Sequence, residues 1–530
     1  MKILVAEPLA PAGVALLKAQ PGWEVVVSNP KEYAEHLAST DALIVRSAVK
    51  VNADLLAKAP RLRVIGRAGV GVDNVDLPAA TAAGVLVMNT PGGNAVSVAE
   101  HTIALMLSLA RSIPQASAST KSGKWEKKKY LGSELRGKTL GVIGLGSIGR
   151  ELVRRAAPFE MRIIASDPYV SSLTAADLHI ELVDLKTLYQ QSDYITLHMA
   201  LTPETQNLIN KVALDSMKTG VRLINCARGE LIDTAALQDA MASGKVAGAG
   251  LDVFDKEPPS ADNPILQQEN LVATPHIGGS TEEAQEIVGV RIVEQIVEYL
   301  QHGVAINAVN MPTLSPDQYR DVAPYVVLAE RLGNFAAHVS TGNPKAVRLI
   351  YKGRIAEQNT NLMRNGGVAG VLNRSLSRKA NLVNSLQLAA DRGWTVEERH
   401  EKRESHIDSI RLELESDSGC TAVEGAVIVG IPRIVAVDDI FIEAPLAGHL
   451  TFLKNDDVPG VIGHVGNVLG RNQVNIASFS LGRKLAPAGP DQPLEAVSVV
   501  ETDQAVPDQV LVELLKNQAI RMARPVEFIP

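Results

Sequence analysis

Short apolar runs alternate with longer periodic stretches through the first 300 or so residues of the chain. In the first hundred residues these runs are rich in Val, Ile and Leu, and turn-forming residues bound each of them. They read KILVAEP, WEVVVS, DALIVRS, RVIGRAG and VLVMNTP. Strands that alternate with helical stretches are typical of parallel β-α units, so we expect a complete small α/β domain here.

The periodic stretch 97–113 predicts a single helix that leads into a second domain of the same kind. Six further apolar runs follow it, reading TLGVIGLG, RIIASDP, DYITLHM, VRLINCARG, VAGAGLDVF and NLVATPH. A long helix is then expected, with Ser280 or Thr281 as its N-cap and acidic residues in its first turn. This helix can return the chain to the first domain. We therefore expect one lobe at 1–98, completed by 284–306, and a second lobe at 99–283.

The last 220 or so residues show a different pattern. The runs IDSIRLELES, AVEGAVIVG and RIVAVDDIFIEA predict antiparallel strands with polar faces, within an α+β domain at 307–445. The final domain, 446–530, reads as strand, loop, helix and strand. The stretch DQVLVELLKN predicts a helix as the last element of the chain.

Composition narrows the functional classes. A chain of 530 residues is long enough for about three to five domains, and 46% hydrophobic residues can build real cores. The net charge of −7 argues against a nucleic-acid or anionic-membrane binder. The two cysteines, Cys226 and Cys420, are far apart and form no C-x-x-C pair, so we expect neither a disulfide framework nor a metal site. With no signal-peptide pattern and no long apolar run, the protein is expected to be cytoplasmic.

The stretch GVIGLGSIGR has the pattern of a dinucleotide-binding turn. Gly144 allows the tight turn, Gly146 lets the backbone approach a pyrophosphate, and Gly149 lets helix and strand pack closely. Asp167 ends the next predicted strand, at a suitable spacing for a carboxylate that binds the ribose hydroxyls. A carboxylate there favours NAD over NADP, because it repels a 2′-phosphate. The alternative is an ordinary glycine turn beside a surface aspartate.

Three later residues supply the groups that oxidation of a hydroxy acid needs. Arg228, Glu257 and His276 follow predicted strand ends, where parallel sheets bind ligands. His276 can take the hydroxyl proton, and Glu257 can orient the imidazole and stabilise its charged form. Arg228 can bind a substrate carboxylate with its fork of donors. Taken singly, each residue could equally be a surface charge or a structural histidine.

The motifs GRAGVGVDNVD, GLGSIGR, NCARGELID, GLDVFDKEPP and TPHIGGST together resemble the D-isomer-specific 2-hydroxyacid dehydrogenases over about residues 1–306. LIVRSA, GKWEKKKYLGSELRGKTLGVIGLG and the C-terminal extension resemble the long-form D-3-phosphoglycerate dehydrogenases within that family. The resemblance implies two Rossmann-like, doubly wound lobes that bind substrate and NAD on either side of a cleft. It also implies an α+β intervening domain and a ferredoxin-like ACT domain after them.

The same resemblance assigns residues. Arg228, Glu257 and His276 match the catalytic set. The positions that match substrate-binding residues for 3-phosphoglycerate are Arg46, Arg67, Gly69 and Asn94. The positions that match cofactor-binding residues are Gly144, Gly146, Ser147, Ile148, Gly149, Asp167, Met199, Cys226, Ala227, Asp252, Gly278 and Gly279. Lys127 to Lys129 follow Trp125 in a segment that would reach a neighbouring subunit of a homodimer or homotetramer. The alternative for this lysine run is a solvated face.

The C-terminal stretch LKNDDVPGVIGHVGNVLGRNQVNIASFSLGR resembles an ACT domain, which binds amino acids. By that resemblance Asp457 and Asn475 would bind L-serine as a feedback inhibitor, with Asn455 nearby and a helix N-terminus receiving the carboxylate. The alternative is a domain that serves only dimerisation. The intervening domain could sense anions or relay serine binding, and the sequence does not decide between these roles.

The resemblance implies NAD-dependent oxidation of D-3-phosphoglycerate to 3-phosphohydroxypyruvate, the first step of L-serine synthesis. One alternative is another D-2-hydroxyacid dehydrogenase, such as a hydroxypyruvate or glyoxylate reductase, although the C-terminal extension argues against it. The other is a non-enzymatic NAD-sensing protein like the corepressors that share this fold, and the intact Arg-Glu-His set argues against that.

Overall fold

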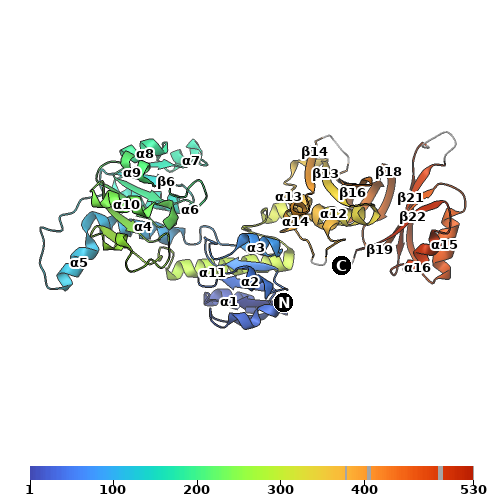
Figure 1. Ribbon diagram of the computed structural model, residues 1–530, viewed down its shortest axis with the longest axis horizontal. Helices are drawn as coiled ribbons and strands as arrows, with labels where there is room; N and C mark the ends of the chain where they lie inside the picture. The colour runs from blue at the N-terminus through green and yellow to red at the C-terminus, as the bar shows by residue number, and fades with distance from the viewer. Residues whose placement is uncertain (377–378, 403–406, 487–492, 529–530) are drawn as a thin grey trace.

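The computed structural model describes residues 1–376, 379–402, 407–486 and 493–528. Four units lie in a row along the longest axis of the molecule (Figure 1). The second unit of the sequence lies at one end, the first lies next to it, and the third and fourth follow. This order arises because the chain leaves the first lobe, builds the second, and then returns before it enters the C-terminal half. The predicted fold class is confirmed: parallel sheets in the first half and further sheets in the second.

The first lobe is a parallel sheet of five strands in the order β2-β1-β3-β4-β5. This is the flavodoxin-like variant of a doubly wound sheet. Each strand lies within one of the five apolar runs of the sequence. The strands are β1 (Lys2–Val5), β2 (Glu24–Val27), β3 (Ala42–Val45), β4 (Val64–Arg67) and β5 (Leu86–Met88), and the helices between them are α1 (Pro11–Lys18), α2 (Ala53–Ala57) and α3 (Leu77–Ala82).

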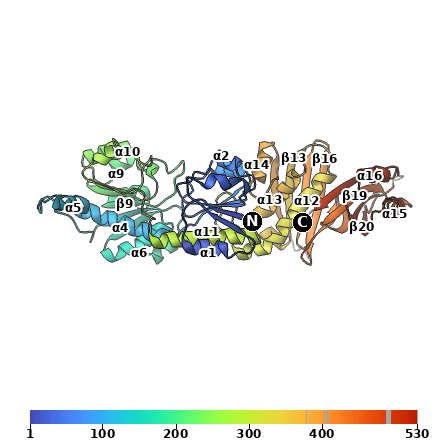
Figure 2. The same cartoon turned by 90° about the horizontal axis from the view of Figure 1, so that it is seen from below.

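The long helix α11 (Glu282–His302) packs onto this first sheet, alongside α1 (Figure 2). Thr281 is its N-cap and accepts a hydrogen bond from the Ala284 N–H, so one of the two expected caps is confirmed. The crossing with α1 is close, because a Cβ on Gly13 would lie 2.8 Å from the Gly289 carbonyl oxygen. The buried residues Ile292 and Ile296 of α11 join the core of the first lobe.

The second lobe is a parallel sheet of seven strands in the order β12-β11-β10-β9-β6-β7-β8, the order of a Rossmann fold with one added strand. The short strand β8 was not predicted. The strands are β6 (Thr139–Ile143), β7 (Arg162–Ser166), β8 (Glu181–Leu182), β9 (Tyr194–Leu197), β10 (Val221–Asn225), β11 (Val246–Leu251) and β12 (Leu271–Ala273). The helices that accompany them are α6 (Ser147–Ala156), α7 (Ser172–Asp177), α8 (Leu185–Gln191), α9 (Lys211–Ser216) and α10 (Thr234–Ala242).

The connecting helix expected at 97–113 is α4 (Ala95–Arg111), which ends where Ser112 adopts a left-handed φ of 48°. A second helix, α5 (Ile113–Lys121), continues at an angle of 64°. Across the ranges that the structure describes, no single helix has the length and apolar character to span a membrane, and α4 and α5 meet that test only when taken together.

The third unit is a six-stranded sheet in the order β14-β13-β15-β16-β17-β18. The predicted antiparallel strands at IDSIRLELES and AVEGAVIVG are confirmed, but the third predicted run, RIVAVDDIFIEA, forms two antiparallel strands and not one. Strands β13 and β14 were not predicted. The strands are β13 (Pro344–Lys352), β14 (Thr395–Glu401), β15 (Ser409–Ser416), β16 (Gly419–Ile428), β17 (Ile431–Val437) and β18 (Ile440–Pro445). The helices are α12 (Pro316–Val339), α13 (Asn361–Leu372) and α14 (Ser385–Asp391). Helices α12 and α13 pack closely, since a Cβ on Gly333 would lie 2.1 Å from the Gly367 carbonyl oxygen.

The fourth unit has the βαββαβ topology of a ferredoxin-like fold, with an antiparallel sheet in the order β20-β21-β19-β22. Its elements are β19 (Gly448–Asp456), α15 (Val461–Arg471), β20 (Ile476–Arg483), β21 (Glu495–Thr502), α16 (Asp508–Leu514) and β22 (Ile520–Phe528). The expectation that the chain ends with a helix is wrong, because β22 follows α16. Pro525 obscured this strand in the sequence, but proline is tolerated on an edge strand.

Candidate active site between the two lobes

His276 and Glu257 form a hydrogen-bonded pair at the carboxyl end of the second sheet. Nδ1 of His276 lies 2.7 Å from Oε2 of Glu257, and the other oxygen of Glu257 accepts the Phe254 N–H at 3.1 Å. The glutamate is thus fixed by the loop after β11, and it fixes the imidazole in turn. Half of the His276 side chain remains exposed, so its Nε2 can meet a substrate.

Asp252 holds the loop that carries His276. Its side chain is 1% exposed, and its oxygens accept the N–H groups of Ile277 and Gly278 and the hydroxyl of Thr274. Burial alone would raise the pKa of this carboxyl, but hydrogen bonds from His101, Thr274 and the loop backbone hold it below its ordinary value. The assignment of Asp252 to cofactor contact rests on the resemblance, and the structure adds this support of the loop.

Two arginines from different lobes meet across the cleft. Arg228 follows β10 in the second lobe, and its Nη2 lies 2.7 Å from Oδ2 of Asp73 in the first lobe. Arg67 ends β4, and its buried Nε has no hydrogen-bond partner among the described residues. Burial first, and the like charge of Arg228 second, hold the pKa of the Arg67 guanidinium below its ordinary value. A buried donor without a partner, beside a second cation, is suited to an anionic ligand.

The loop after β4 gives both guanidinium groups room. Gly69 has a φ of +150°, and a Cβ there would lie 1.5 Å from Nη1 of Arg67. A Cβ on Gly71 would lie 1.9 Å from Nη2 of Arg228. Glycine at position 69 suits its positive φ, and at both positions the absence of a Cβ leaves the guanidinium groups where they are. This closeness supports the expected placement of Gly69 beside the substrate.

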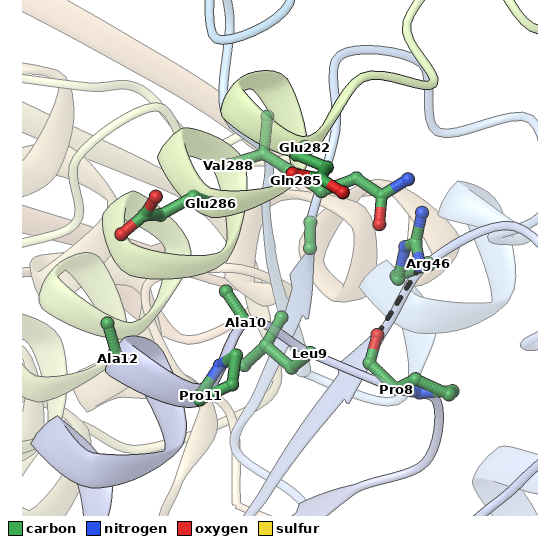
Figure 3. A pocket seen from close by; sticks show the side chains of 11 residues that line it. Pro8, Leu9, Ala10, Pro11, Ala12, Arg46, Glu282, Gln285, Glu286 and Val288 are labelled. Atoms are coloured by element: carbon green, nitrogen blue, oxygen red, sulfur yellow. Dashed lines mark hydrogen bonds between the residues drawn. The ribbon is translucent and has the colours of Figure 1, made fainter.

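Arg46 lies at the edge of a pocket of about 440 Å³ in the first lobe (Figure 3). The loop after β1 and the first turns of α11 line this pocket, and Gln285 extends toward Arg46. Glu7 fixes the Arg46 backbone, because its buried carboxylate accepts the N–H groups of Arg46 and Val49 at 2.8 and 2.9 Å. A guanidinium with an anchored backbone and an open side of the pocket can hold a phosphate.

Asn94 lies where the first lobe passes into α4. Its Oδ1 is buried without a hydrogen-bond partner among the described residues. A Cβ on Gly279 would lie 2.7 Å from its Nδ2, so the loop after His276 approaches Asn94 closely. The structure thus brings Gly279, expected near the cofactor, next to Asn94, expected near the substrate.

The glycine turn has the geometry that a dinucleotide needs. Gly144 has a φ of +94°, and a Cβ on Gly149 would lie 2.2 Å from the Gly144 carbonyl oxygen. At Gly146, by contrast, a Cβ would meet nothing within 4 Å, which leaves open space in front of the α6 N-terminus. Oδ2 of Asp167 accepts the Leu145 N–H at 2.8 Å, so this carboxylate lies directly beside the turn. The turn therefore fits a pyrophosphate, with a ribose near Asp167.

The remaining expected cofactor positions surround this turn at different depths. Ser147 is exposed and Ile148 half-buried in the first turn of α6, and Met199 is half-buried after β9. Cys226 is buried, and burial raises the pKa of its thiol to about 12, so the thiol stays protonated and serves packing. The Ala227 carbonyl accepts a hydrogen bond from Nη1 of Arg228 at 2.7 Å and so helps to orient that side chain.

The three residues expected at a serine site each contact a different neighbour. Asp457 pairs with Arg483 at 3.2 Å, and Nδ2 of Asn475 donates to Asp503 at 2.8 Å. Asn455 is 1% exposed and its Nδ2 donates to the Asp456 carbonyl. The described residues show no hydrogen bond that joins the three to one another.

Sequence reasoning missed three residues of this region: Glu7, Asp73 and Gln285. Glu7 comes shortly after β1, and Asp73 lies in the loop after β4, so both belong to the carboxyl ends of parallel strands. That position was a usable signal. Gln285 lies in the first turn of α11, and only packing of α11 against the first lobe brings it near Arg46.

Comparison with known proteins agrees with this geometry. The family description "D-isomer specific 2-hydroxyacid dehydrogenase, NAD binding domain" matches residues 103–278, and "D-3-phosphoglycerate dehydrogenase intervening domain" matches residues 321–438. D-3-phosphoglycerate dehydrogenase of Methanocaldococcus jannaschii is 43% identical over 96% of this chain and 97% of the relative. The enzyme of the same name from Archaeoglobus fulgidus is 41% identical over the whole of both chains.

The chain belongs to the D-3-phosphoglycerate dehydrogenase family. The resemblance seen in the sequence is thereby confirmed, as is NAD as the cofactor. The solved D-lactate dehydrogenase of Aquifex aeolicus, complexed with NAD and lactic acid, is similar to the first half of the chain. It has a TM-score of 0.52 and 29% identity, and it covers 59% of this chain and 100% of its own.

Proposed function

We propose that this protein oxidises D-3-phosphoglycerate to 3-phosphohydroxypyruvate with NAD⁺, as the first step of L-serine synthesis. The observation that carries the proposal is the hydrogen-bonded His276–Glu257 pair of the second lobe. Arg228 of the same lobe reaches Asp73 of the first lobe and lies near Arg67. Full-length relatives named D-3-phosphoglycerate dehydrogenase support the choice of substrate.

The chemistry follows from the atoms that face the cleft. Nε2 of His276 takes the proton of the C2 hydroxyl, and Glu257 stabilises the imidazolium that forms. The Arg228 guanidinium holds the substrate carboxylate and polarises the reacting oxygen. The turn formed by Gly144, Gly146 and Gly149 would hold NAD⁺, which would supply the acceptor for the hydride of C2. In the reverse direction His276 returns the proton to the carbonyl oxygen.

Arg46 and Arg67 are assigned to the phosphate end of the substrate. The orphaned Nε of Arg67 and the anchored backbone of Arg46 support this assignment. Backbone near Gly69 and the free Oδ1 of Asn94 complete the substrate contacts. A substrate with a carboxylate at one end and a phosphate at the other matches cations drawn from both lobes.

The domain roles in this proposal follow the lobes. Residues 1–98 with 284–306 bind the substrate, and residues 99–283 bind NAD. Residues 307–445 are the intervening domain, and residues 446–530 are an ACT domain. The packing of α11 onto the first sheet and the βαββαβ order of the last unit support these roles.

Regulation and assembly form the second part of the proposal. L-serine binds beside Asp457 and Asn475 and inhibits the enzyme, which works in the cytoplasm as a homodimer or homotetramer. Trp125 and Leu131 support an oligomer, because they are 85% and 92% exposed in the segment after α5 and a second subunit could cover them. Cys226 and Cys420 are both free thiols, which fits a reducing compartment.

The test is NADH oxidation with 3-phosphohydroxypyruvate, run with and without L-serine, against hydroxypyruvate and glyoxylate as competing substrates. We expect 3-phosphohydroxypyruvate to be reduced with the highest kcat/KM. A preference for glyoxylate or hydroxypyruvate would instead identify a different 2-hydroxyacid dehydrogenase. Turnover that is indifferent to serine would leave the enzyme assignment intact and reject the regulatory part.

A further inference from the structure

The Asp73 carboxylate of the first lobe contacts two nitrogens of the Arg228 guanidinium, Nη2 and Nε. Nη2 of Arg228 lies 2.7 Å from Oδ2 of Asp73, and its Nε donates to Oδ1 at 3.2 Å. Two parallel N–H···O contacts are the geometry in which arginine binds any carboxylate. Without substrate, the guanidinium is therefore already engaged by a carboxylate of the protein itself.

Arg228 and Asp73 differ in how many contacts their own lobes make with their side chains. Arg228 is 27% exposed and its Nη1 donates to the Ala227 carbonyl, so its own lobe holds the guanidinium in place. Asp73 is 66% exposed, and its carboxylate makes no other hydrogen bond among the residues that the structure describes. The aspartate can consequently leave the arginine at little cost, whereas the arginine stays.

The backbone around Asp73 presents it to the cleft. The neighbouring residue Asn74 donates from Nδ2 to the carbonyls of Arg46 and Val49 and so ties the loop to the end of β3. Gly71 leaves room for Nη2 of Arg228 in the same loop. The loop thus anchors the backbone beside Asp73, whose largely exposed side chain reaches Arg228.

The charges of the cleft explain why a carboxylate belongs there. Arg46, Arg67 and Arg228 bring three positive charges together, and the burial of Arg67 makes their mutual repulsion costly. The carboxylates of Asp73 and Glu7 offset this positive charge, but the oxygens of Glu7 already accept hydrogen bonds from backbone N–H groups. Asp73 is therefore the exposed acid that compensates the arginines when no anionic substrate is present.

We propose that Asp73 stands in for the substrate carboxylate on Arg228 and is displaced from it when the substrate binds. The proposal rests on the proposed function, which supplies a substrate with a carboxylate. Displacement makes substrate binding a direct exchange of one carboxylate for another. It also breaks one contact between the lobes at the moment when the substrate forms new ones.

The test compares Asp73→Asn and Asp73→Ser with Asp73→Glu, which keeps the charge. Asp317→Asn is the matched control, since it removes a carboxylate from an exposed arginine pair on α12, far from the cleft. If Asp73 competes with the substrate, Asn and Ser should lower the KM for D-3-phosphoglycerate about two- to fivefold, the range for a part-exposed ion pair. kcat should not fall with it, the Glu variant should keep a KM closer to that of the wild type than the Asn and Ser variants do, and the control should match the wild type.

Two outcomes would overturn the proposal. An unchanged KM would show that Asp73 does not compete, and a raised KM with a lowered kcat would show that Asp73 holds Arg228 in its working position. Wild-type turnover tests the proposed function separately. If the wild type turned over no phosphohydroxy acid, tighter binding of oxalate to the NADH complex of Asp73→Asn than of the wild type, read by NADH fluorescence, would still support the exchange, and equal or weaker binding would reject it.

Discussion

Nδ1 of His276 lies 2.7 Å from Oε2 of Glu257, although 19 residues separate them in the sequence. They come from the loops after β11 and β12, which are adjacent parallel strands. Both loops leave the same edge of the sheet, so the pair is a product of strand order. The pair is also partly exposed, which leaves Nε2 available for proton transfer.

Removing the imidazole should remove the proton acceptor. We expect His276→Ala to lower kcat by about 10²- to 10⁴-fold, the usual contribution of a positioned acid or base. Glu257→Gln should cost less, because the imidazole remains while its charged form loses a partner. Steady-state kinetics measure both, with NADH affinity as the control for an intact fold. A near-wild-type kcat for His276→Ala would show that another group moves the proton.

Arg228→Lys keeps the charge but loses the planar fork of donors. We expect kcat/KM for D-3-phosphoglycerate to fall about 10- to 100-fold, as expected when charge-assisted hydrogen bonds are lost. Arg222→Lys is the matched control, since Arg222 lies on β10 and stacks over Tyr194, away from the cleft. Equal losses in both variants would mean that the effect comes from the strand and not from substrate binding.

The glycine turn offers a pair of variants with opposite expectations. Gly149→Ala places a Cβ 2.2 Å from the Gly144 carbonyl oxygen, so it should destabilise the second lobe by about 1–3 kcal/mol. Gly146→Ala meets nothing within 4 Å and should leave the fold intact while it weakens NADH binding. Denaturant unfolding and NADH fluorescence separate the two effects. A stable Gly149→Ala protein with normal NADH affinity would contradict this account.

Asp252 predicts a dependence of stability on pH. Because its pKa is lowered in the folded protein, its contribution is present above the ordinary aspartate pKa of about 3.9 and is lost as pH falls through the lower folded value. Asp252→Asn should therefore cost about 1–3 kcal/mol at pH 7. The difference from the wild type should shrink in acid below about pH 4. Thermal unfolding at several pH values measures this, and a difference that is constant down to pH 3 would reject it.

Much of this candidate site could be predicted from the sequence. Gly144, Gly146 and Gly149 follow a strand and open a helix, so the local pattern alone predicts their geometry. Arg228, Glu257 and His276 were predicted from their place after apolar runs. Asp73 and Gln285 were not predicted from the sequence, because their importance lies in contacts between the lobes and between α11 and the first lobe. Strand β22 was not predicted, because Pro525 normally argues against a strand. Proline is tolerated here since β22 lies at the edge of its sheet.

The sequence by itself determined the periodic strands and helices, the glycine turn and the charged residues that carry the chemistry. These features depend on short-range order, on side-chain period and on backbone freedom, all of which a linear chain displays. Only the tertiary structure decided that α11 places Gln285 in the pocket beside Arg46 and that Asp73 pairs with Arg228 across 155 residues. Such pairings depend on how whole sheets and helices bury their apolar faces against one another, and no local pattern encodes that outcome.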